Sequence, residues 1–170
     1  MDFLTLATER YSCKKYSGRQ VDQPVLDEIL EAGRVAPTAK NLQEHKVYVL
    51  RSQEALSKFD SICPCRYGAQ TVLVVTFDKT NVFVYPGGKR DSGVEDATIA
   101  AAHIMLAAAS KGVDSCWINN LDPDKLSNAL GLPENEEILM ALDLGYAAEG
   151  AGPMPNHTKR RTLEEMTVYM

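Results

Sequence analysis

The chain has 170 residues, of which 45% are hydrophobic and 24% are charged, and its formal net charge at pH 7 is −5. This composition is ordinary for a globular domain and excludes the disordered and collagen-like classes. The acidic balance argues against nucleic acid as the main partner. No apolar run reaches the roughly 20 residues that span a bilayer, and no signal core follows Met1, so we expect a cytoplasmic protein without a membrane partner.

The first element in chain order is a helix from Asp2 to about Arg10, which delivers a basic stretch, Arg10–Tyr16. In an extended chain, side chains alternate, so Arg10, Ser12 and Lys14 would lie on one side. A guanidinium, a hydroxyl and an ammonium group together suit one phosphate monoester. The sequence therefore predicts an anion site, and the alternative is a solvated basic turn.

The other expected elements alternate along the chain. The expected helices are 24–36, a short one from residue 52, 94–111 and 123–130, and the expected strands are 46–50, 71–77, 114–118 and 137–146. The Ala-rich helix 94–111 has little polar face, which predicts a core helix or one that crosses a subunit interface. Thr162 and Glu165 form a capping box, and residues 167–170 have strand propensity.

Two helices precede every strand, which favours an α+β sandwich over a doubly wound dinucleotide fold. The chain has neither G-x-G-x-x-G nor G-x-x-x-x-G-K-[ST], so a phosphate site would be made of side chains. The four cysteines are irregularly spaced, and Cys63-Pro64-Cys65 lacks a second Cys/His pair, so we expect reduced thiols rather than disulfides or zinc.

Three motifs follow one another: Arg10-x-Ser12-x-Lys14-x-Tyr16, the loop Ala36-Pro37-Thr38-Ala39-Lys40-Asn41-Leu42-Gln43, and Lys159-x-Arg161. Their order and spacing resemble the nitroreductase family of FMN-dependent oxidoreductases, specifically its short members. The resemblance covers nearly the whole chain.

The resemblance implies a central, mostly antiparallel sheet flanked by helices, and a domain-swapped homodimer with two FMN sites at the interface. Residues 1–155 would form a single FMN-binding domain, and the basic segment 156–170 would pack on the partner subunit. The loop Pro37–Asn41 would come from the partner. The implied chemistry passes hydride from NAD(P)H through FMN to a small electrophilic acceptor such as a nitroaromatic or a quinone.

The resemblance also assigns the site. Lys14 would lie near the flavin N1, and a backbone N–H of Asn119 or Asn120 would face N5, where longer members often have a Glu-Gly pair. The stretch 61–70 matches the pattern poorly and leaves Cys65 and Arg66 as candidate neighbours of the flavin. The residues assigned to the cofactor are Arg10, Tyr11, Ser12, Lys14, Pro37, Thr38, Ala39, Asn41, Trp117, Ile118, Asn119, Asn120, Lys159 and Arg161. No side chain is assigned as catalytic, because the cofactor performs the difficult step.

Two other functions remain open at this point. One is a flavin-binding dimer that stores or senses its ligand with little turnover. The other is a related reductive dehalogenase or enoate reductase on the same scaffold.

Overall fold

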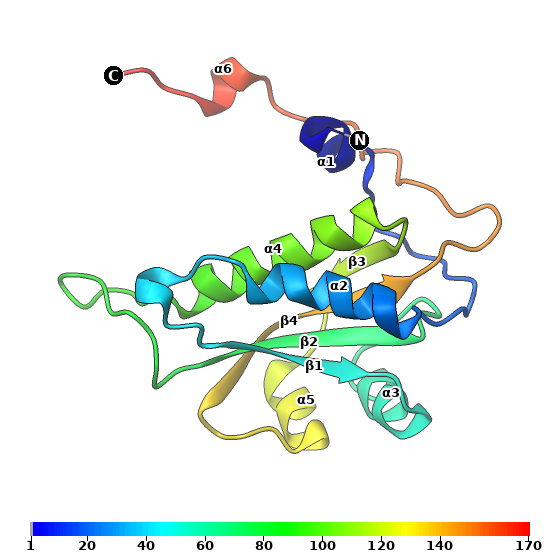
Figure 1. Ribbon diagram of the computed structural model, residues 1–170, viewed down its shortest axis with the longest axis horizontal. Coiled ribbons are helices and arrows are strands. Elements are labelled where there is room, and N and C mark those ends of the chain that lie inside the picture. Colours follow the sequence, from blue (N-terminus) through cyan, green and yellow to red (C-terminus); the bar gives the residue numbers. More distant parts are fainter. Residues whose placement is uncertain (1) are drawn as a thin grey trace.

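The computed structural model describes residues 2–170, and its centre is an antiparallel sheet of four strands in the order β1-β2-β4-β3 (Figure 1). The strands are β1 (His45–Leu50), β2 (Thr71–Asp78), β3 (Asp114–Ile118) and β4 (Glu136–Gly145). The helices are α1 (Phe3–Glu9), α2 (Gln23–Arg34), α3 (Gln53–Asp60), α4 (Gly93–Ser110), α5 (Pro123–Leu130) and α6 (Leu163–Met166), with a 3-10 turn η1 (Ala39–Asn41). These bounds confirm the expected elements, and the antiparallel α+β fold is confirmed.

Helices cover both faces of the sheet, which is why β2 is buried along nearly its whole length. One core lies between the sheet and the pair α2 and α4, and it includes Leu73, Ile104 and Leu142. The other lies on the opposite face, beneath α3 and α5, and it includes Phe59 and Leu126. Successive strand residues point to opposite faces, so each central strand contributes to both cores.

Helix α4 packs closely on α2 because Gly33 has no side chain. A Cβ atom at Gly33 would lie 2.7 Å from Cδ1 of Ile104, inside van der Waals contact. The helix ends at a left-handed glycine, Gly112 (φ +70°), which is the C-terminal stop expected from the sequence. This long helix separates the two regions that carry the predicted cofactor motifs.

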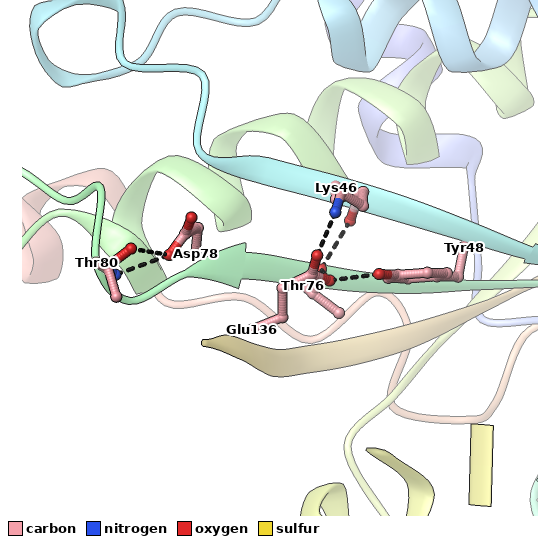
Figure 2. A network of polar contacts seen from close by, with 6 residues as sticks. All are labelled: Lys46, Tyr48, Thr76, Asp78, Thr80 and Glu136. Carbon is pink, nitrogen blue, oxygen red and sulfur yellow. Dashed lines mark hydrogen bonds and ion pairs between the residues drawn. The ribbon is translucent and has the colours of Figure 1, made fainter. Parts of the chain in front are cut away.

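A buried carboxylate, Glu136, ties three strands together at one end of the sheet (Figure 2). It accepts hydrogen bonds from the Tyr48 hydroxyl (2.6 Å) and the Thr76 hydroxyl (3.0 Å), and it pairs with Lys46. The register between β2 and β4 shifts between Val75 and Thr76, so this network fixes the pairing just past the shift. A buried carboxylate is stable here because every partner is a donor.

Both ends of the chain lie outside the two cores. In Figure 1, α6 and the C-terminus extend away from the sheet and the helices that cover it. The capping box is confirmed, since Thr162 and Glu165 exchange side-chain and backbone hydrogen bonds. Large apolar side chains are exposed at the two ends: Phe3, Leu4, Leu163, Met166, Val168 and Tyr169. Among residues 2–170, no helix is long and apolar enough to cross a membrane.

Candidate functional site

The predicted anion motif runs along the outer edge of the sheet, beside β3. Ser12 forms a parallel bridge with Ser115, and the N–H of Cys13 donates to the carbonyl of Ser115 at 2.9 Å. The Cys13 side chain is fully buried, whereas Lys14 is exposed. The stretch pairs with β3 at this point, with Cys13 directed into the protein and Lys14 directed toward solvent.

A cavity of about 390 Å³ lies between the basic stretch, the end of β3 and the C-terminal segment. Its lining residues are Arg10, Tyr11, Ser12, Lys14, Cys116, Trp117, Met154, Asn156, His157 and Arg160. Among these lining residues there is no carboxylate, and most of the polar groups are donors or cations. A cavity of this composition favours an anionic ligand.

The surroundings of Arg10 give the clearest indication of an anion-binding site. Arg10 is half-buried, and its Nε atom is buried without a hydrogen-bond partner among residues 2–170. Burial, followed by the positive charge of Arg160, lowers the pKa of Arg10. Two guanidinium groups therefore face one cavity without a compensating carboxylate, and a phosphate would supply both the acceptor and the negative charge.

The C-terminal segment reaches this cavity through its own chain. The ring of His157 lies 6.5 Å from that of Tyr11, edge to face, and its Nε2 is 3.0 Å from the carbonyl oxygen of Thr8. These contacts bring Asn156 and Arg160 to the cavity. Lys159 and Arg161, the two cations assigned by resemblance, are exposed and do not line this cavity within residues 2–170; they stay predictions.

Sequence reasoning missed Asn156, His157 and Arg160 for a specific reason. The motif Lys159-x-Arg161 selects alternate positions, but the chain turns at Met154–Lys159, and the intervening arginine is the one that lines the cavity. The sequence does show that Arg160 belongs to one cluster of three cations with Lys159 and Arg161, and this could have made it a candidate.

The turn after β3 carries the residues assigned to the flavin ring. The indole N–H of Trp117 donates to the side-chain oxygen of Asn119 at 2.9 Å, and the Asn120 amide donates to the sulfur of Cys65 at 3.3 Å. Both asparagines are exposed. Ile118 is only 3% exposed and packs in the core beneath α3 and α5, so its side chain faces away from the turn.

The second predicted motif lies at the other end of α4. Residues Pro37–Gln43 form a tight loop in which Lys40, Asn41 and Gln43 have positive φ values of 50°, 56° and 54°. Asp96, near the start of α4, holds this loop through the N–H of Ala39. Arg10 instead shares a pocket with residues at the end of α4.

The distance between these motifs follows from helix geometry. From Asp96 to Ala109, α4 rises about 20 Å at ~1.5 Å per residue. One chain therefore does not bring Pro37, Thr38, Ala39 and Asn41 to the Arg10 cavity. A second copy in the opposite orientation would bring its own loop to this cavity. That is the dimeric arrangement that the resemblance implied.

A family model described as "Nitroreductase family" matches residues 7–65 and 63–146. A protein of Archaeoglobus fulgidus named "Putative NADH dehydrogenase/NAD(P)H nitroreductase" is 31% identical over 154 residues, which cover 84% of each chain. The crystal structure of a nitroreductase family protein from Clostridium difficile is 31% identical, covers 99% of this chain and 98% of that chain, and superimposes with a TM-score of 0.92.

A further structure, described as a "putative nitroreductase in complex with FMN" from Exiguobacterium sibiricum, shares the fold. Its TM-score is 0.86 at 18% identity, and the match covers 100% of this chain and 98% of that chain. The fold class expected from the sequence is therefore that of solved nitroreductase-like structures.

Proposed function

The chain belongs to the nitroreductase family of oxidoreductases, and on this premise we propose that it binds FMN and passes hydride from NAD(P)H to a small electrophilic acceptor, such as a nitroaromatic or a quinone. When bound, FMN would supply the hydride acceptor and donor in one group. The residues of this chain would then hold, orient and polarise the cofactor.

The observation that supports the proposal most directly is the donor-rich cavity around Arg10. FMN ends in a phosphate monoester that carries close to two negative charges near pH 7. The unpartnered Nε of Arg10, the hydroxyl of Ser12 and the guanidinium of Arg160 are donors suited to its oxygens. Lys159 and Arg161 are also proposed to hold the phosphate, in line with the family motif.

Lys14 and the turn after β3 are proposed to bind the flavin ring. Lys14 is exposed beside the cavity, with its Nζ 5.9 Å from the ring centroid of Tyr67. A cation there would stabilise negative charge near N1 of the ring. Trp117 lines the cavity and offers an aromatic face, and backbone N–H groups at Asn119 or Asn120 would donate toward N5.

We propose that the working form is a homodimer in which the loop Pro37–Asn41 completes the partner's cofactor site. Three features support this arrangement: the two motifs lie at opposite ends of α4, the loop is preformed, and α6 and the residues beyond it leave apolar side chains uncovered. Burying such side chains is the usual driving force for association. Residues 1–155 would then be the FMN-binding domain, and 156–170 would pack on the partner.

The first experiment is the visible spectrum of the purified protein after incubation with FMN and gel filtration. We expect retained FMN whose visible absorbance is lost when NADH or NADPH is added without oxygen, and protein that elutes without FMN would overturn the proposal. Addition of a quinone should then give continuous oxidation of NAD(P)H. Bound FMN with negligible turnover would instead support the storage or sensing function.

A matched control uses two arginines. Arg34 is exposed and paired with Glu31 on α2, away from the cavity. R34A should retain FMN as the wild type does, whereas R10A should not. Equal retention by both variants would remove Arg10 from the site.

A further inference from the structure

A second chemical feature lies beside the cavity, in the turn after α3. Cys63 and Cys65 are separated by one proline and differ sharply in exposure. Cys63 is fully buried, and its N–H donates to the carbonyl of Phe59 at 2.8 Å. Cys65 is half-buried and reaches the surface near the turn after β3. One thiol is thus accessible to a small molecule while its neighbour is shielded.

Polar groups surround the sulfur of Cys65. The amide of Asn120 donates to it at 3.3 Å, and contacts with Asn120, Tyr67 and Cys63 lower the pKa of its thiol. The nearby positive charge of Lys14 acts in the same direction. Burial raises the pKa of Cys63 to about 11. Because the thiolate is the reactive form, Cys65 is the nucleophile of the pair, and Cys63 is the protonated thiol.

A buried carboxyl group lies in the same layer of the core. Asp143 is fully buried in β4, and within the described part of the chain neither of its side-chain oxygens has a hydrogen-bond partner. Such a group is costly, and burial raises its pKa to about 9. The nearest cation, Arg66, is already bound to Asp60 at 2.7 Å and to the carbonyl of Ala69 at 2.5 Å.

The strand register shows which way Asp143 points. Asp143 lies opposite Cys116 of β3 and two positions from Ala141. Cys116 and Ala141 belong to the core that also contains Cys63, and side chains two apart on a strand share a face. The unpartnered carboxyl group is therefore directed into the layer of the core that holds the buried thiol.

We propose that Cys65 and Cys63 form a redox-active dithiol that reduces a small hydroperoxide, with the neutral carboxyl group of Asp143 as the acid that protonates the departing hydroxide. The Cys65 thiolate attacks one peroxide oxygen, the O–O bond breaks, and the leaving hydroxide or alkoxide takes a proton from solvent. Cys65 becomes a sulfenic acid and the peroxide is reduced by two electrons.

The second step converts the sulfenic acid into a disulfide within the same chain. The Cys63 sulfur attacks the sulfur of the Cys65 sulfenic acid, and the S–O bond breaks. The departing hydroxide takes the proton that Asp143 already carries and leaves as water, and the proton of the Cys63 thiol replaces it on Asp143. The product is a Cys63–Cys65 disulfide, and neither step uses FMN.

The arrangement favours a small hydroperoxide over a bulky oxidant. Cys65 is only partly exposed, and the amide of Asn120 beside it can donate to the leaving oxygen. Low thiol pKa, access to solvent and an adjacent resolving thiol are the features that make a cysteine sensitive to peroxide. Cys13 and Cys116 lack them, because both are buried and their thiol pKa values are raised by burial.

The test is thiol mapping by mass spectrometry on the reduced full-length protein after one equivalent of hydrogen peroxide. We expect the wild type to lose two thiols and two hydrogen atoms, with the disulfide located at Cys63 and Cys65. C63S should stop at a sulfenic acid on Cys65 that a dimedone probe captures, and C65S should leave Cys63 unoxidised. C13S is the control and should behave as the wild type does.

The role of Asp143 is tested by the rate of the second step. D143N has nearly the same shape, and we expect its disulfide to form on the order of a hundredfold more slowly, with unchanged oxidation of Cys65. Wild-type-like disulfide formation by D143N would overturn the role of Asp143. Oxidation of Cys13 or Cys116 at the rate of Cys65 would overturn the proposed dithiol. These oxidation rates are measured on the wild-type protein, so the result does not depend on whether a variant folds.

Discussion

The Asp96 carboxylate accepts the backbone N–H of Ala39 on both of its oxygens, each at 3.0 Å. Asp96 is 4% exposed, so this contact is sheltered from water. It connects the start of α4 to a loop in which three residues other than glycine have positive φ values. Positive φ is unfavourable for residues with a side chain, and the anchor therefore stabilises a loop that would otherwise relax.

Replacement of Asp96 should release this loop. We expect D96A to lose roughly 1.5–3 kcal/mol of unfolding free energy, because the charged hydrogen bonds to Ala39 disappear. FMN retention should fall as well if the loop completes the partner's site. Urea unfolding and FMN titration measure the two effects. D124A, at an exposed aspartate on α5, is the control, and equal stability of both variants would contradict the anchor.

Glu44 gives the fold a dependence on pH. Burial, and then its hydrogen bond with Asp96, raises the pKa of Glu44 from 4.5 to about 7. Between these two values the folded state holds more protons than the unfolded state, so the free energy of unfolding should fall as pH rises from about 4.5 to about 7 and then stay level.

The measurement for Glu44 is the free energy of unfolding of wild type and E44Q across that range. E44Q should show a flatter curve, and the difference between the two proteins should change most between pH 5 and 7, as roughly expected from the linkage relation. Parallel curves would show that Glu44 does not titrate there. D124N, which changes an exposed carboxylate, is the matched control.

Removal of the Arg10 side chain should weaken FMN binding by roughly 1.5–3 kcal/mol, which is about ten- to a hundredfold in Kd. The reason is the loss of a charge-assisted contact from a side chain that has no competing partner at Nε. Fluorescence titration of FMN measures the change. R161A is expected to weaken binding similarly.

Arg160 provides the sharpest comparison within the tail. Arg160 and Arg161 are both exposed, but among residues 2–170 only Arg160 of the two lines the cavity. If R160A loses FMN and R161A does not, the phosphate contact comes from Arg160. If both lose it, the cluster acts together, and retention by both would exclude the segment from the phosphate site.

Lys14 should affect the potential of bound FMN more than its retention. We expect K14M to lower the two-electron potential by tens of millivolts, on the order of a single nearby charge, because negative charge on the reduced ring loses its cation. Spectroelectrochemical titration measures this. Lys15 offers a matched control, since its Nζ donates to the carbonyl of Glu149 at 2.9 Å, and K15M should leave the potential unchanged.

The dimer can be tested by deleting residues 162–170. This deletion removes five exposed apolar side chains, Leu163, Met166, Val168, Tyr169 and Met170, and leaves His157 and Arg160 in place. Light scattering should give a dimer for the full chain and a concentration-dependent mixture for the deletion. A monomeric full chain that still retains FMN would contradict the proposed sharing of the site.

The sequence was sufficient for the elements because strong periodicity marks them. The apolar run of β2, the proline and glycine at the ends of α5, and the capping box at Thr162 each depend on local chemistry that the structure retains. The basic stretch was likewise recognisable from its residue types, and Arg10, Ser12 and Lys14 do line one cavity, together with Tyr11.

Other features depend on contacts between distant residues, which no local pattern encodes. The position of Arg160 at the cavity follows from the turn at Met154–Lys159 and from the contact of the His157 ring with that of Tyr11. The isolation of Asp143 follows from the pairing of Arg66 with Asp60 instead. Ile118 was assigned to the cofactor by resemblance, yet its side chain fills the core, so only its backbone could take part.

The bridge between Ser12 and Ser115 has a consequence for solubility. β3 is an outer strand, and an uncovered outer strand is a template on which other chains can add. The segment that occupies this position carries Arg10, Lys14 and Lys15, whose like charges repel an approaching copy. The proposed phosphate-binding stretch therefore also reduces edge-to-edge aggregation. A chain shortened at its amino end would lose the cover of β3 and the repelling charges together.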